Sequence, residues 1–167
     1  MMSRILLAVF LCLPSIPATA ADLPSPTGPV VLTVTGQIAH TNADGTAQFD
    51  QAMLDALPQR TTTAVTPWLE GSHSFSGPLG SALLDAVGAD GARLRVVALN
   101  DYAADVPAQD LRDFDVIFAT AIDGQALTVR DKGPLFLIYP FDERPELFNE
   151  VYFGRSVWQI VRIDVLE

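Results

Sequence analysis

The stretch Leu135-Phe-Leu-Ile-Tyr139 constrains the fold more than any other part of the sequence. Its five consecutive apolar residues are bounded by Gly133-Pro134 on one side and by Pro140 on the other. A short apolar run closed at both ends by turn formers predicts a fully buried strand. Charged residues crowd its ends, where scaffolds often present functional sites. A run such as Arg130-Asp-Lys132 is also typical of a solvated turn.

Hydrophobic alternation and turn formers predict a mainly β chain around this strand. We expect strands at residues 30–36, 47–49, 60–65, 93–99, 115–121, 127–129, 135–139 and 157–165. We expect short helices at residues 51–57, 78–87 and 106–112, with Asp50 and Gly88 as caps. Residues 71–76 are predicted as a loop and residues 140–154 as a long irregular segment. The predicted fold class is α+β, a mainly β single domain whose short helices connect strands.

The first 20 residues are predicted to be a signal peptide. Arg4 supplies the positive charge, residues 5–13 form an apolar run, and Ala18-Thr-Ala20 resembles a cleavage site. The apolar run is too short to span a bilayer comfortably. We expect an extended segment at residues 21–29, a domain at residues 30–167, and a periplasmic location.

Cysteine and charge exclude several classes of function. Cys12, the only cysteine, lies inside the predicted signal peptide, so the mature chain would have neither a disulfide nor a thiolate ligand. Ten Lys and Arg residues face twenty Asp and Glu residues, which disfavours nucleic acid and anionic membranes as partners. This scarcity of basic residues draws attention to Lys132, the only lysine.

Several phrases of the sequence, in this order, resemble a known family. They are Val34-Thr-Gly36, Leu57-Pro58, Trp68, Phe75-Ser-Gly-Pro-Leu79, Ala98-Leu-Asn-Asp-Tyr102, Asp123-Gly124, Lys132-Gly-Pro134, Tyr139-Pro140 and Ser156-Val-Trp-Gln-Ile160. Together they resemble the molybdopterin-binding oxidoreductase domain of the sulfite oxidase type, in a compact periplasmic form. The resemblance runs from about Val30 to Val165 and implies that fold and a pterin pocket.

The chain departs from that family at the metal ligand. The resemblance implies that catalytic members bind molybdenum through a cysteine, where this chain has Thr62-Thr-Ala-Val-Thr-Pro67. Soft ligands suit such a metal, whereas a threonine hydroxyl is hard and weakly acidic. We therefore expect a pterin or molybdopterin-like ligand without molybdenum.

Recognition of a flat pterin needs an aromatic face, a carboxylate or amide, and donors for its carbonyl. Asn100 and Asp101 have an alternative role in a turn, and Trp68 and Tyr102 an alternative role in packing. His73 is a candidate proton donor, but with His40 as the only other histidine it gives little support for a metal site. The candidate ligand-binding residues are Trp68, Asn100, Asp101, Tyr102, Arg130, Lys132, Arg155 and Ser156.

These observations favour a periplasmic, non-redox pterin-binding module that acts as a ligand sensor or carrier for a partner such as a membrane receptor. One alternative is a molybdopterin-dependent oxidoreductase subunit whose metal is held without cysteine. Another is a purely structural interaction domain. The aromatic residues of segment 140–154 suit either a pocket cover or a docking surface.

Overall fold

The computed structural model describes residues 23–167. The predicted signal peptide at residues 1–20 lies outside the described residues. Within residues 23–167, no helix is both long enough and apolar enough to cross a membrane.

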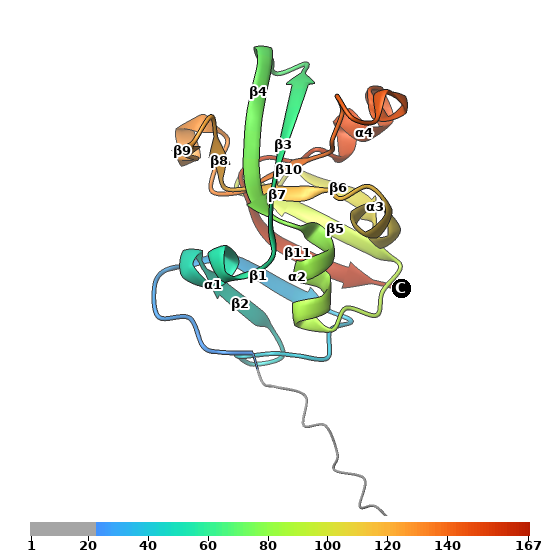
Figure 1. Cartoon of the computed structure of the whole chain (residues 1–167). Helices are drawn as coiled ribbons and strands as arrows, with labels where there is room; N and C mark the ends of the chain where they lie inside the picture. The colour runs from blue at the N-terminus through green and yellow to red at the C-terminus, as the bar shows by residue number, and fades with distance from the viewer. Residues whose placement is uncertain (1–22) are drawn as a thin grey trace, which may run out of the picture.

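A five-stranded sheet forms the base of the molecule in the order β2-β1-β11-β5-β6 (Figure 1). Its first and last strands in sequence, β1 and β11, pair in parallel, and the other neighbours pair antiparallel. Alternate residues of each strand point into the core, as a sheet with one covered face requires. The strands are β1 (Val30–Gly36), β2 (Ala47–Asp50), β5 (Arg93–Ala98), β6 (Ala103–Pro107) and β11 (Ile160–Leu166).

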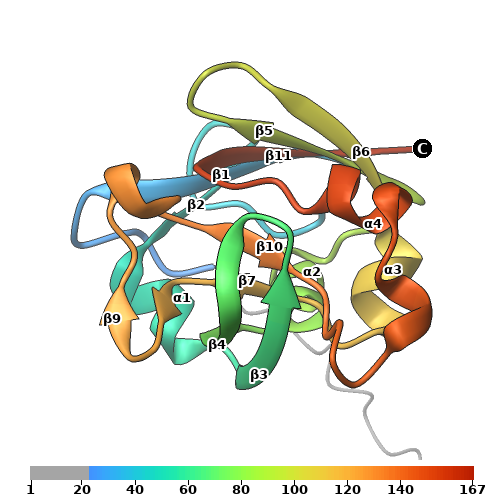
Figure 2. The ribbon, with the colours of Figure 1, turned by 90° about the horizontal axis from the view of Figure 1, so that it is seen from above.

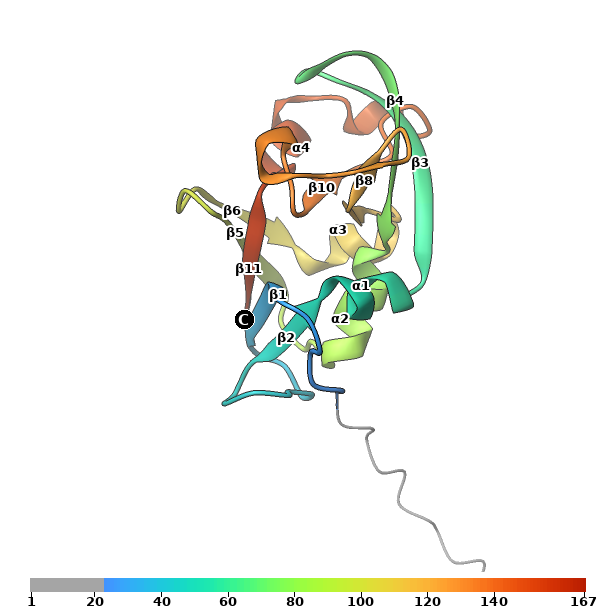
Figure 3. The same ribbon diagram turned by 90° about the vertical axis from the view of Figure 1, so that its left-hand side faces the viewer.

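Above this sheet, a long hairpin belongs to a second sheet of order β3-β4-β8-β9. Figure 3 shows the β3–β4 hairpin rising from the base and bending over the top of the molecule. A separate pair, β7 and β10, lies between the two sheets (Figure 1). These strands are β3 (Gln59–Thr66), β4 (Leu69–Pro78), β7 (Ile117–Ala119), β8 (Ala121–Ile122), β9 (Gln125–Ala126) and β10 (Phe136–Ile138).

The helices are short and connect strands, as the sequence predicted. Asp50 caps the first by accepting a hydrogen bond from the Met53 amide at 2.9 Å, and also accepts from the amides of Thr27 and Gly28. These bonds hold the pKa of Asp50 below its usual value. Gly88 caps the second with φ 59°. The helices are α1 (Gln51–Ala56), α2 (Gly80–Val87), α3 (Ala108–Asp113), α4 (Glu150–Arg155) and the 3₁₀ turns η1 (Val129–Asp131) and η2 (Pro145–Leu147).

The buried strand predicted at Leu135–Tyr139 is confirmed. All five side chains are fully buried, although only the central three residues form β10. One edge pairs antiparallel with β7, and on the other the Leu137 amide donates to the Val157 carbonyl at 2.9 Å. All five residues of Leu135–Tyr139 are apolar because backbone partners and apolar side chains surround this strand on all sides.

Some sequence expectations are wrong. Residues 71–76, predicted as a loop, lie inside β4. The return strand predicted at residues 127–129 is instead β9 at Gln125–Ala126, and segment 140–154 contains α4. Strand β6 was not predicted at all.

These errors share a physical origin, because long-range pairing or capping overrides local composition. The small polar residues of β4 are held by backbone pairing with β3, from Gln59↔Pro78 to Val65↔Ser72. Helix α4 begins where the Asn149 side chain accepts a hydrogen bond from the Val151 amide at 3.0 Å. Neither the pairing of β4 with β3 nor the capping of α4 is visible in the hydrophobic periodicity of the sequence.

A buried carboxylate joins the core strand to two helices. Asp110 in α3 accepts a hydrogen bond from the Tyr139 hydroxyl at 2.7 Å and from the Arg155 guanidinium at 2.8 Å. Burial, together with the neighbouring Asp110 charge, raises the pKa of Tyr139. The Tyr139 hydroxyl therefore stays protonated and acts as a hydrogen-bond donor. Arg155, the last residue of α4, connects that helix to the core through Asp110.

We expect Tyr139→Phe to lower the free energy of unfolding by about 1–2 kcal/mol, because it leaves the buried carboxylate one donor short. Urea unfolding followed by circular dichroism measures this change. Tyr152→Phe is the matched control, since the Tyr152 hydroxyl makes no hydrogen bond within residues 23–167, and it should change stability by less than about 0.5 kcal/mol. Equal effects of the two substitutions would contradict the role assigned to Asp110.

Candidate functional site

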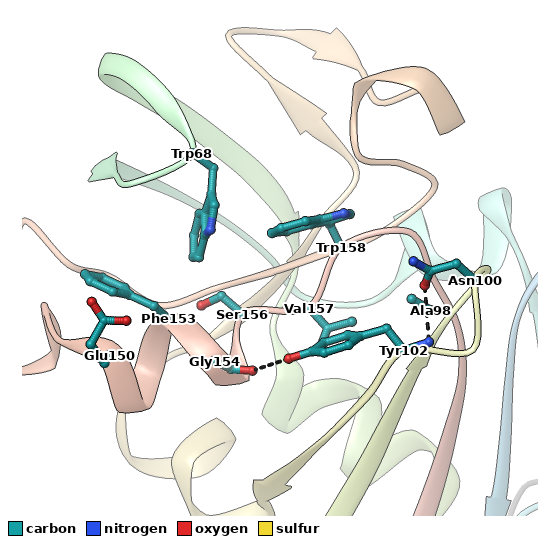
Figure 4. Close-up of a pocket in the computed structure, with 10 residues that line it drawn as sticks. All are labelled: Trp68, Ala98, Asn100, Tyr102, Glu150, Phe153, Gly154, Ser156, Val157 and Trp158. Atoms are coloured by element: carbon teal, nitrogen blue, oxygen red, sulfur yellow. Dashed lines mark hydrogen bonds between the residues drawn. The ribbon is translucent and has the colours of Figure 1, made fainter.

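Two neighbouring clefts open beneath the tip of the β3–β4 hairpin, and Trp68 lines both. Seen from above, the hairpin, α4, η1 and the β5–β6 turn surround this region (Figure 2). The first cleft has a volume of about 440 Å³, within the roughly 300–1,000 Å³ typical of small-molecule sites. It is lined by Trp68, Ala98, Asn100, Tyr102, Glu150, Phe153, Gly154, Ser156, Val157 and Trp158 (Figure 4).

Four of the ten residues that line the first cleft are aromatic. Trp68 lies in the tight turn that joins the paired residues Thr66 and Leu69, so the hairpin places its indole over the rest of the site. Its ring centroid lies 5.8 Å from that of Trp158 and 5.9 Å from that of Phe153, both edge to face. Figure 4 shows the Trp68 and Trp158 rings on one side of the cleft and Tyr102 on the other.

The turn between β5 and β6 supplies the polar end of this cleft. The side-chain oxygen of Asn100 accepts from the Tyr102 amide at 3.2 Å, so the turn interpretation of Asn100 is confirmed. Its amide nitrogen makes no hydrogen bond within residues 23–167 and remains a donor. The Tyr102 hydroxyl donates to the Gly154 carbonyl at 3.4 Å (Figure 4). Asp101 has φ 65° in the same turn and lines neither cleft.

Helix α4 forms the wall opposite the hairpin, and it supplies a carboxylate that sequence reasoning missed. Glu150, the first residue of α4, lines the cleft. Two predicted ligand residues at the end of α4 have structural partners instead. Arg155 is bound to Asp110, and the Ser156 hydroxyl donates to the Tyr152 carbonyl at 2.9 Å. Ser156 lines the first cleft, whereas Arg155 lines neither. The sequence signal for Glu150 was the helix-capping residue Asn149 directly before it.

The second cleft, of about 410 Å³, contains the basic residues that the sequence singled out. Arg130 and Lys132 have no carboxylate within 4 Å among residues 23–167. The Lys132 ammonium lies 4.5 Å from the centre of the Trp158 ring, a cation–π contact that joins the two clefts. The lining residues are Trp68, Leu69, His73, Ile122, Asp123, Gln125, Ala126, Leu127, Arg130, Asp131 and Lys132.

The eight predicted site residues divide into those that line the first cleft, those that line the second and those that line neither. Trp68, Asn100, Tyr102 and Ser156 line the first cleft, and Arg130 and Lys132 line the second. Asp101 and Arg155 lie outside both. The structure places six of the eight candidates in two clefts that share Trp68 as a common wall.

The donor atoms in this region do not fit a thiolate-bound metal. Residues 23–167 contain no cysteine and no group of three or more His, Cys, Asp or Glu side chains placed to hold a metal. The stretch 62–67, which replaces the expected cysteine, lies in β3 and the hairpin turn. There the Thr62 hydroxyl donates to Glu143 at 3.3 Å, and the Thr66 hydroxyl is buried without a partner in the described chain.

Comparison with known proteins identifies a likeness in structure but none in sequence. No family model matches the chain, and no curated protein matches it significantly. Among solved structures, the chain resembles the sulfane dehydrogenase SoxCD from Paracoccus pantotrophus, with a TM-score of 0.61 and 20% identity. The match covers 81% of this chain and 37% of that chain. The chain spans about a third of the length of that protein. The likeness shows a shared fold, and the structure confirms the predicted fold class, an α+β, mainly β domain with short connecting helices.

Lys132 has φ 72°, a conformation that favours glycine. We expect Lys132→Gly to be more stable than Lys132→Met by roughly 0.5–1 kcal/mol, since both lose the cation–π contact but only glycine relieves the strain. Arg130, two residues earlier in the 3₁₀ turn η1, is the control position. There the order should reverse, with the methionine variant unfolding at higher urea concentration. Methionine being favoured at both positions would contradict the geometry of Lys132.

Proposed function

We propose that this chain is a periplasmic, non-redox module that binds a pterin or a pterin-like heterocycle and acts as a ligand sensor or carrier. The observation that supports this most is the first cleft itself. It combines several aromatic rings with an amide donor and a carboxylate, which is the set of groups that a flat heterocycle with polar edges requires.

Each group has a part in this proposal. Trp68 and Trp158 supply apolar ring surface against which the heterocycle packs. The Glu150 carboxylate accepts from amino and ring N–H groups, and the Asn100 amide donates to a carbonyl oxygen. Arg130 and Lys132, across the shared wall, donate to a second carbonyl or to an anionic tail of the ligand.

The absence of a cysteine from residues 23–167 supports a non-redox role. A molybdenum centre of this fold type would need a soft protein ligand, and the threonines of β3 provide only hydroxyls. The chain would thus keep the scaffold and use it for recognition. The proposed partner is a membrane receptor or another periplasmic protein. The exposed Phe148 and Val151, beside the first cleft, are the apolar surface that such a partner would contact.

The second candidate is a molybdopterin-dependent oxidoreductase subunit whose metal is held without cysteine. The likeness in fold to a sulfane dehydrogenase favours it. Metal analysis of the protein purified from its native host separates the two proposals. Stoichiometric molybdenum supports the oxidoreductase, whereas pterin without molybdenum supports the binding module.

Intrinsic fluorescence tests the binding proposal directly. The chain has two tryptophans. Both line the first cleft and Trp68 also lines the second, so quenching reports on ligand bound beneath the β3–β4 hairpin. We expect oxidised or reduced pterins, titrated into purified protein, to quench this signal to saturation. No saturation at high micromolar pterin would count against the proposal.

We expect Glu150→Gln to raise the pterin Kd roughly tenfold or more, because a hydrogen bond to a charged group contributes about 1.5–3 kcal/mol. Glu146→Gln is the matched control. Glu146 lies nearby in η2, 3.6 Å from the Arg144 guanidinium, and lines neither cleft. The control should keep the Kd of the unchanged protein, measured by the same fluorescence titration or by calorimetry. Equal affinity in both variants would remove Glu150 from the site.

A further inference from the structure

The only histidine in β4 connects that strand to the small β8–β9 hairpin. His73 Nδ1 lies 2.7 Å from the Asp123 carboxylate, and His73 Nε2 lies 2.9 Å from the Glu70 carbonyl oxygen. Both partners are pure acceptors. A neutral imidazole has one N–H and can satisfy only one of them, whereas an imidazolium donates to both.

The β8–β9 hairpin has few other attachments to the molecule. Strands β8 and β9 have two residues each, and β8 pairs with β4 only through Phe75↔Ile122 and Ser76↔Ala121. Directly before β8, the Thr120 amide donates to the Ser76 carbonyl at 2.8 Å, and the other bonds to β4 converge on Asp123. Its amide donates to the Ser74 carbonyl at 2.7 Å, and its carboxylate accepts from the Ser74 amide at 2.9 Å.

We infer that His73 is a proton-dependent latch that holds the β8–β9 hairpin against β4 and thereby sets the shape of the second cleft. The hairpin forms one wall of that cleft through Ile122, Asp123, Gln125 and Ala126. Loss of the proton leaves one N–H for two acceptors. The charged Asp123 carboxylate retains that N–H, so the bond to the Glu70 carbonyl breaks and the bond between His73 and Asp123 loses its charge assistance and weakens. The inference concerns the second cleft and does not depend on pterin binding.

The charges around the latch determine the pH range over which it operates. The hydrogen bond to Asp123 and then the Glu70 carbonyl raise the pKa of His73 above its usual 6.5, and the hydrogen bond from His73 lowers the pKa of Asp123 below its usual 3.8. Arg130 and Lys132, from the η1 segment across the cleft, oppose the imidazolium charge, and Asp131 favours it. A raised histidine pKa means that both hydrogen bonds of the latch are present below about pH 6.5, and that the latch weakens as pH rises through the folded-state value.

Hydrogen exchange followed by NMR tests this inference in the full-length folded protein. After correction for intrinsic exchange rates, the protection of the Ser74 and Asp123 amides should fall several-fold as pH rises through the His73 midpoint. The β5–β11 amides should keep their protection over the same range. Uniform protection of both regions across that midpoint would overturn the inference.

Substitutions separate the latch from ordinary packing. His73→Gln should abolish the pH step, because glutamine does not titrate. Asp123→Asn should move the His73 midpoint, read from its ring proton resonance, downward towards 6.5. His40→Gln is the control, since His40 lies against the Ala86 carbonyl in another part of the molecule, and it should leave the step intact. A step that persists in folded His73→Gln, or a midpoint unchanged in Asp123→Asn, would overturn the assignment.

Discussion

The arrangement of the molecule depends on one buried carboxylate. Asp110 lies in α3, and it accepts from Tyr139 of the core segment and from Arg155 at the end of α4. A buried charge is tolerated only with such partners. The Arg155–Asp110 contact therefore anchors the end of α4 to the core, and within α4 the same guanidinium packs over the Tyr152 ring, 5.2 Å from its centre. The wall of the first cleft is thus positioned from inside the core.

The second organising feature is the position of Trp68. A hairpin turn carries this residue over the aromatic rings of Phe136, Phe153 and Trp158, and edge-to-face packing holds it there. One indole thereby lies between a cleft with four aromatic residues and a cleft that contains Arg130 and Lys132. Lys132, which lines the second cleft, makes a cation–π contact with Trp158, which lines the first. Aromatic ring surface and cationic side chains are therefore adjacent but separate in this protein.

The sequence predicted those parts of the fold that depend on local patterns. The buried run at Leu135–Tyr139 was recognisable because both of its ends are closed by proline, and the Asp50 and Gly88 caps because each residue type has one strong structural role. Strand β4 could not be recognised, since its Gly and Ser residues become a strand only by pairing with β3.

The candidate site was likewise predictable only where single residues stood out in the sequence. Trp68 and Lys132 stood out by residue type and rarity, whereas Glu150 resembled any surface glutamate until α4 was placed. Arg155 was expected to meet a ligand because basic residues are scarce. Sequence alone could not show that a buried aspartate, distant in the chain, already binds it.

The parallel pairing of β1 with β11 has a consequence for the order of assembly. Strand β11 is the last strand in the sequence, yet it lies in the middle of the five-stranded sheet, between β1 and β5. The two antiparallel pairs β1–β2 and β5–β6 are therefore separate ribbons until residues 160–166 arrive and unite them. Contacts of such large sequence separation slow folding, since loop-closure entropy is lost before pairing compensates for it. Chains that lack residues 160–166 would leave the facing edges of β1 and β5 unpaired, and unpaired edges favour aggregation.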